Sequence, residues 1–166
     1  MKTKLIIGVI LLCSACGRYN HPDPNVISFS YRQSDIQKSF DTLYQQQQTS
    51  AGLYMGFIEQ ALAISPRTTQ NDTITQDVMS SMYLNRYTGN YDCVTTTTFC
   101  FKDGNISATG MFHLAPGDTI APDHDFPITG GSGAYHNIYG TYTRKYKDGV
   151  YHVKLRYDKF DKGNKE

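Results

Sequence analysis

NIYGTYTRKYKDGVYHVKLRY, residues 137–157, is the stretch that decides the fold of this chain. After its Asp-Gly pair, the residues alternate between two faces of a strand: one face carries Tyr151, Val153, Leu155 and Tyr157, and the other carries His152, Lys154 and Arg156. An Asp-Gly pair between two such segments is a strong β-hairpin signal, and the alternation is typical of a sheet with one buried face. We therefore expect Val153 and Leu155 to be buried and Lys154 to be exposed.

Similar signals upstream predict an all-β domain. Asp103-Gly104 lies between 94–101, which is rich in threonine and aromatic residues, and a further predicted strand at 106–114. Residues 53–64 are apolar enough for a helix or a strand, and their Tyr, Phe and Ile content favours a strand; residues 78–87 are also predicted as a strand. About seven or eight short strands joined by hairpin turns are typical of a sandwich or a closed barrel.

The segment before these strands is predicted to hold a tether and one short helix. Residues 17–33 contain His21-Pro22-Asp23-Pro24 and little periodicity, which favours a tether. Residues 34–48 are predicted to be helical. Ser34 and Gln37 fit a capping box, and apolar residues recur at helical spacing at Ile36, Phe40, Leu43 and Tyr44. We expect this helix to pack on its own barrel, and a helix that binds a partner is the alternative.

The first sixteen residues predict export from the cytoplasm. The start is basic, with Lys2 and Lys4, and a short apolar run follows at Leu5–Leu12. Two small residues, Ser14 and Ala15, then precede Cys16, which completes the pattern of a secretory signal. The apolar run is shorter than the roughly 20 residues of a transmembrane helix. Cys16 resembles the lipidated cysteine of a bacterial lipobox, although Cys13 stands where leucine is usual. The alternative is cleavage after Ala15 and a free secreted protein.

The expected organisation is a signal peptide (1–15), a tether with the short helix (16–50), a β-barrel domain (51–160) and a tail (161–166). After removal of the signal, 14 Lys and Arg remain against 15 Asp and Glu. A near-neutral chain of this length suits one domain and lacks the basic footprint of nucleic-acid binding. We expect no nucleic-acid partner and a location at the cell envelope, at the outer membrane or its periplasmic face, with the lipid as the only membrane attachment.

Cys93 and Cys100 would remain as a pair in an oxidising compartment. On one extended strand, seven residues at about 3.3 Å each separate them by about 23 Å, whereas a disulfide needs Cα atoms within about 7 Å. We expect two buried free thiols. A chain that folds back within residues 95–98 is the alternative, and it would allow a disulfide.

Residues 126–140, FPITGGSGAYHNIYG, resemble the signature of the dirigent and allene oxide cyclase-like barrel superfamily. The matching positions are Pro127, Gly130, Gly131, Ser132 (in place of Thr), Gly133, Tyr135 and Gly140; upstream, 99–104 with Ile106 and Gly110 resembles the strand–turn–strand of that superfamily. The resemblance covers about residues 75–146. It implies an eight-stranded antiparallel barrel with a cavity open at one end, and a homotrimer as the common assembly.

The chain also departs from the dirigent pattern, since His124-Asp125, His136 and Tyr139 replace its Arg-Glu pair and two further arginines. These departures remove basic groups and argue against radical coupling. The glycines at 130, 131 and 133 are interpreted as architecture, because glycine allows a positive φ and a close approach of neighbouring chain. They are not a phosphate loop, which needs a strand-to-helix context.

Candidate catalytic residues are few. Glu59 is the only acid in an apolar stretch of twelve residues, and an inward position would mark it as functional; an outward one would make it a surface charge. His124, between Asp123 and Asp125, could act as an oriented acid–base group, or lie in a solvated loop. His113 and His124 lack a third ligand, so we expect no metal and no cofactor.

Three functions are compatible with this sequence. The first is an envelope-anchored lipoprotein barrel that binds an apolar or aromatic small molecule in its lumen. The second is a cyclase or isomerase of the allene oxide cyclase type, which acts by positioning a reactive conformer. The third is a structural or interaction barrel with a filled lumen and no ligand. Glu59 or His124 facing the interior would favour the second function.

The anchor prediction can be tested with Cys16→Ser. We expect this change to release the protein from membranes or to leave its precursor uncleaved, because the chain has no second apolar segment outside the predicted domain. Palmitate labelling and mass spectrometry of the mature N-terminus measure the outcome. An unmodified N-terminus in the soluble fraction of the parent protein would contradict lipidation.

Overall fold

The computed structural model describes residues 23–39, 47–49, 52–64, 73–118 and 120–160 of the 166-residue chain. In these ranges the elements are β1 (Val26–Arg32), the 3-10 turn η1 (Gln33–Asp35), β2 (Ile36–Ser39), β3 (Gln47–Thr49), β4 (Gly52–Ile64), β5 (Thr73–Leu84), β6 (Tyr91–Phe101), β7 (Gly104–Leu114), β8 (His124–Gly131), the 3-10 turn η2 (Gly133–Tyr135), β9 (Ile138–Lys147) and β10 (Val150–Lys159). The prediction of an all-β chain is confirmed.

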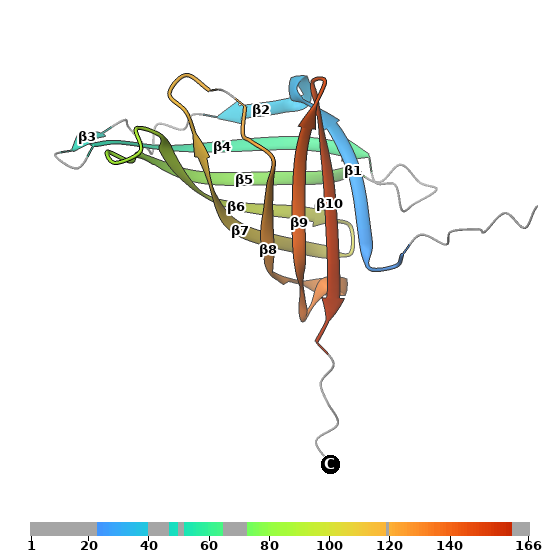
Figure 1. Cartoon of the computed structure of the whole chain (residues 1–166). Helices are drawn as coiled ribbons and strands as arrows, with labels where there is room; N and C mark the ends of the chain where they lie inside the picture. The colour runs from blue at the N-terminus through green and yellow to red at the C-terminus, as the bar shows by residue number, and fades with distance from the viewer. Residues whose placement is uncertain (1–22, 40–46, 50–51, 65–72, 119, 161–166) are drawn as a thin grey trace, which may run out of the picture.

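The strands form one antiparallel sheet in the order β1-β10-β9-β8-β7-β6-β5-β4-β2, with β3 also paired to β4. Its eight long strands, β1 and β4–β10, curl into a half-barrel. Figure 1 shows β4–β7 crossing β8–β10 at a steep angle, as expected of a strongly twisted sheet. The predicted eight-stranded antiparallel architecture is therefore observed, with the short β2 and β3 added on β4.

The turn between β9 and β10 fixes which side chains reach the interior. Asp148 and Gly149 have φ values of 51° and 80°, and a two-residue type I′ hairpin requires positive φ at both positions. Val153 and Leu155 are 2% and 0% exposed, and Lys154 is exposed, as predicted. Because Val153 pairs with Arg144 across the hairpin, the same register turns Arg144 inward.

Aromatic side chains fill the middle of the half-barrel. Phe29 of β1 lies with its ring centroid 5.8 Å from that of Phe99 on β6, and Phe99 lies 5.0 Å from Tyr142 on β9. Both pairs have the edge-to-face geometry that aromatic rings favour. These contacts join strands on opposite walls, so this layer is a packed core and not an open channel.

The two ends of the interior differ. At one end Tyr135 of η2 is buried against Tyr157 and Phe101, with centroid distances of 5.7 and 5.0 Å. At the other end, which we call the open end, inward-facing side chains of five strands are only half-buried: Met82, Tyr91, Leu114, His124 and Tyr146. Solvent therefore approaches the interior from the open end.

Near the open end the sheet is split between β7 and β8. The ladder joins Ile106–Ala108 to residues 128–131, with a register shift after Ser107, and does not extend to the last residues of β7. Gly110 lies beyond the ladder, and a Cβ there would overlap the Phe126 ring. Side-chain rings therefore join the two strands where backbone hydrogen bonds end.

Two predictions for the N-terminal part are wrong where the structure describes it. Ile36–Ser39 form β2, paired with β4, instead of the start of a helix over 34–48, and residues 40–46 lie outside the described residues. Val26–Arg32, expected in the tether, form β1 along β10. In both cases pairing with a neighbouring strand overrides the local sequence signal. The described segments contain no helix with the length and hydropathy needed to cross a membrane.

Cys93 and Cys100 do not form a disulfide, as predicted. Cys93 and Cys100 are free thiols on β6, and their odd separation places them on opposite faces of that strand. Cys93 is buried, and burial raises its pKa to about 11, whereas Cys100 is only half-buried. Neither thiol has the lowered pKa of a reactive cysteine.

The backbone requires glycine at two of the three positions of the glycine run, for a different reason at each. Of the three glycines, only Gly133 has a positive φ, at 60°, so the expected positive φ at Gly130 and Gly131 is wrong. A Cβ at Gly131 would overlap the Tyr135 carbonyl oxygen, and one at Gly133 would overlap that of Asp103. Gly130 has open space around it.

These differences predict a graded response to alanine. Gly131→Ala and Gly133→Ala should each destabilise the fold by more than about 1 kcal/mol, since a backbone carbonyl must move or a strained φ must be held. Gly130→Ala is the matched control and should stay within about 0.5 kcal/mol of the parent. Urea unfolding of the three variants measures this, and equal stabilities would contradict the assignment.

Candidate functional site

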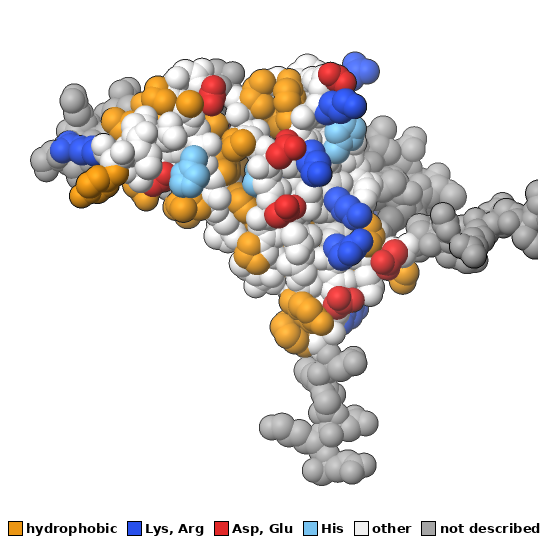
Figure 2. Space-filling model, in the orientation of Figure 1, with side chains coloured by type: hydrophobic (Ala, Val, Ile, Leu, Met, Phe, Trp, Pro, Cys, Tyr) orange, Lys and Arg blue, Asp and Glu red, His pale blue; other side chains and the backbone are white. Residues whose placement is uncertain are grey.

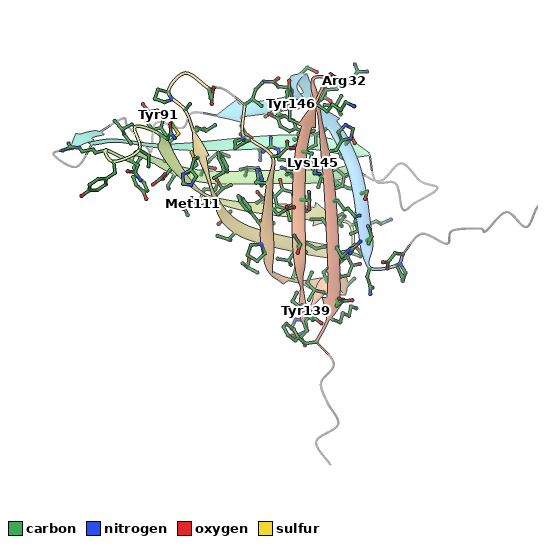
Figure 3. All side chains as sticks on the ribbon, viewed as in Figure 1. Arg32, Tyr91, Met111, Tyr139, Lys145 and Tyr146 are labelled. Atoms are coloured by element: carbon green, nitrogen blue, oxygen red, sulfur yellow. The ribbon has the colours of Figure 1, made fainter. Side chains whose placement is uncertain are left out.

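Six polar side chains gather on the inner face of the half-barrel, from β1, β4, β5, β9 and β10. We call them the inner cluster: Tyr31, Glu59, Gln76, Tyr142, Arg144 and Tyr151. The cluster lies between the packed aromatic layer and the open end. Tyr146, labelled in Figure 3, marks that end of β9.

Arg144 is the centre of the inner cluster and is only 3% exposed. Its Nη2 lies 3.7 Å from Glu59 Oε2, and its guanidinium lies 3.9 Å from the centre of the Tyr151 ring. Burial alone would lower the pKa of Arg144, but Tyr31, Tyr142 and Glu59 together outweigh it and raise that pKa. The guanidinium is therefore a permanent positive charge inside the sheet.

The inner cluster also contains buried polar atoms without a hydrogen-bond partner. They are the Arg144 Nε, the hydroxyls of Tyr31 and Tyr142, and the Gln76 Oε1. Gln76 and Thr97 lie near the two hydroxyls, without the geometry of a hydrogen bond. Burial raises the pKa of Tyr31 to about 12 and that of Tyr142 further, so both hydroxyls keep their proton and can donate it in a hydrogen bond.

Such unpaired groups are costly. A buried donor or acceptor left without a partner costs about 1–3 kcal/mol, and native proteins contain few of them. Four in one cluster, with a guanidinium among them, are typical of a site that completes its hydrogen bonds with a bound molecule or with water.

His124 on β8 borders the inner cluster and pairs with Arg144 across the strands. Its Nδ1 lies 2.8 Å from the Pro122 carbonyl oxygen, which assigns the proton to Nδ1. Its ring stacks on Phe126 at 4.3 Å and on Phe112 at 5.4 Å. Burial is the largest cause that lowers its pKa to about 4. His124 is thus a neutral aromatic group at physiological pH.

The structure brings two of the three catalytic candidates to the interior. Glu59 and His124 both lie beside Arg144, which is the arrangement expected to favour a cyclase or isomerase. However, a histidine with a pKa of about 4 is a weak base at neutral pH, and Glu59 is held by Arg144. This geometry suits binding better than proton transfer.

Asp125 is not part of this site, and His113 does not lie with His124. The Asp125 carboxylate accepts a hydrogen bond from Thr143 on the outer face, and Asp123 accepts one from the backbone N–H of Tyr146. Neither acid therefore orients the imidazole. His113 points to the outer face and pairs with Asp92 at 2.7 Å. Among the described residues, no group of three or more His, Cys, Asp and Glu side chains could hold a metal ion.

Sequence reasoning missed most of the inner cluster. Tyr31 falls in the segment predicted as a tether, and Gln76 lies before the strand predicted at 78–87, whereas the structure begins β5 at Thr73. Arg144, in contrast, shares the parity of Ile138, Gly140 and Tyr142, so the hairpin register was a signal that could have placed it inside.

Comparisons with known proteins do not identify the chain. No protein family and no curated protein matches it. A solved structure described as "Pyocyanin demethylase" is similar at a TM-score of 0.47 and 15% identity, covering 80% of this chain and 99% of that one. A likeness of this degree carries no information about activity.

His124 predicts a specific pH dependence of stability. Its folded pKa of about 4 lies below the unfolded value of 6.5, so the unfolded chain binds a proton first as the pH falls. The stability that depends on neutral His124 is fully present above about pH 6.5 and is lost progressively towards pH 4. The loss should amount to about 3 kcal/mol.

His124→Phe tests this dependence because phenylalanine keeps the ring stack and does not titrate. Urea unfolding of both proteins between pH 7 and pH 4 should give a shallower decline for the variant. The carboxylates common to both proteins serve as the internal control. Parallel declines would contradict the buried, neutral state of His124.

Proposed function

We propose that the chain is an envelope lipoprotein whose half-barrel binds a small aromatic molecule that carries a hydrogen-bond acceptor, such as a carbonyl or a carboxylate. One observation carries this proposal: a buried guanidinium and two buried phenol hydroxyls have unused donors in an aromatic interior. Arginine presents five N–H donors in a planar fork that matches a carboxylate.

The surroundings of the inner cluster suit the aromatic part of such a ligand. The stack of Phe112, His124 and Phe126 forms one wall beside the split between β7 and β8. The half-buried side chains at the open end provide the approach. Most ligand pockets combine apolar and aromatic walls with a few polar groups that fix orientation.

Glu59 already provides one negative charge beside Arg144, which affects how a charged or a neutral ligand would bind. At 3.7 Å its ion pair with Arg144 is longer than a hydrogen bond, and the Arg144 Nε remains unpaired. A neutral carbonyl would therefore add to the existing pair, whereas a carboxylate would compete with Glu59. Both bring acceptors to donors that are already desolvated, so most of the desolvation cost of the protein groups is met before binding.

The test compares 2-naphthoate with naphthalene, which lacks the acceptor. We expect the full-length protein to bind 2-naphthoate more tightly, as measured by ligand fluorescence. Tyr142→Phe and Tyr31→Phe remove a donor and keep the ring, so each should weaken 2-naphthoate binding by about tenfold, which corresponds to about 1.4 kcal/mol. Binding of naphthalene should change little.

Tyr139→Phe is the matched control, because Tyr139 is on the outer face and 44% exposed. It should leave the binding of both probes unchanged. A folded parent protein that binds neither probe would contradict the proposed function and favour a structural barrel. Equal binding of both probes, insensitive to Tyr31 and Tyr142, would contradict the role of the inner cluster.

A further inference from the structure

A groove lies on the outer face of the sheet, on the opposite side from the inner cluster. It has a volume of about 650 Å³ and is lined by Ser28, Phe29, Ser30, Asp125, Thr143, Lys145, His152, Val153 and Lys154. Figure 2 shows Lys and Arg side chains gathered over β9 and β10, with acidic side chains among them. Lys145, labelled in Figure 3, comes from β9.

The sheet register arranges the polar lining in two adjacent rows. Ser30, His152 and Lys145 face one another across β1, β10 and β9. The next row continues across β8 and consists of Ser28, Lys154, Thr143 and Asp125. Lys145 and Lys154 are therefore diagonal neighbours, about 7–8 Å apart at the backbone and within reach of each other for long side chains.

The two lysines that line this groove have no acidic partner among the described residues. Lys145 and Lys154 are exposed, and no described carboxylate lies within ion-pair distance of either one. Asp125, the acid in the lining, accepts a hydrogen bond from the Thr143 hydroxyl. His152 Nδ1 lies 2.9 Å from the Ser30 hydroxyl, which fixes the ring and leaves Nε2 for another partner.

We propose that this groove binds a phosphate group. Two ammonium groups on a diagonal can converge on one anion. The Ser28 hydroxyl and one donor of the hydrogen-bonded Ser30–His152 pair, either the Ser30 hydroxyl or the His152 Nε2–H, supply further hydrogen bonds around it. Lysine binds phosphate as a compact point charge, and the flexible stems allow both ammonium groups to reach the same oxygens. The phosphate belongs either to a soluble phosphate ester or to the headgroup of an anionic lipid.

The first test uses inorganic phosphate and the full-length protein. We expect saturable binding that shifts the ring signals of His152 in proton–carbon NMR spectra. The double change Lys145→Gln/Lys154→Gln should weaken binding by at least about tenfold. Lys102→Gln, at the exposed turn between β6 and β7, is the matched control and should bind as the parent does.

The second test distinguishes the two sources of phosphate. Vesicles of phosphatidylglycerol and of phosphatidylcholine are compared for binding of the same proteins. A preference for phosphatidylglycerol that inorganic phosphate suppresses and the double variant loses would assign a lipid headgroup. Binding of inorganic phosphate without that preference would assign a soluble ester.

Absence of saturable binding of phosphate and of any preference for phosphatidylglycerol would overturn the proposal. Equal weakening by Lys102→Gln and by the double change would do the same, because it would indicate unspecific attraction. The groove and the inner cluster lie on opposite faces of the sheet, so the double change should leave 2-naphthoate binding intact. The two proposals can therefore fail separately.

Discussion

The register of the β9–β10 hairpin is the constraint on which the rest of the structure depends. Positive φ at Asp148 and Gly149 allows the two-residue turn that pairs Val153 with Arg144 and Leu155 with Tyr142. A slip by one residue would turn every side chain of a strand to the other face. Since the two strands share their inner face, burial of the apolar set on β10 forces an arginine of β9 into the interior.

Burial of Arg144 then determines what surrounds it. An isolated charge in an apolar interior is unstable without partners, and Glu59 and the Tyr151 ring supply two of them from other strands. The pairing remains incomplete, because the Arg144 Nε has no acceptor. In other proteins, replacing a buried ion pair by apolar residues of similar volume is often neutral or stabilising, so the pair by itself is weak evidence of a stabilising role. The proposed binding site would give this charge a role that stability alone does not.

The sequence was sufficient for the β class, for the two Asp-Gly hairpins and for the burial of Val153 and Leu155, because these depend on local turn chemistry and a period of two. It was not sufficient for β1 and β2, whose stability comes from pairing with β10 and β4 across long separations. Of the candidate site, Glu59 and His124 were found as isolated polar residues. The approach of Glu59 on β4 to Arg144 on β9 depends on how the sheet curls, which no local pattern encodes.

The alternation of side chains between the two faces of the sheet allows the two proposed sites to be independent of each other. Alternation along β9 sends Tyr142 and Arg144 inward while Thr143 and Lys145 point outward. The inner set is shielded from water, so its charge and hydroxyls interact strongly with an acceptor that reaches them. The outer lysines are solvated and screened by salt, so they act only through several contacts at once. Binding at the inner site should therefore depend weakly on ionic strength, whereas binding in the groove should weaken as salt is added.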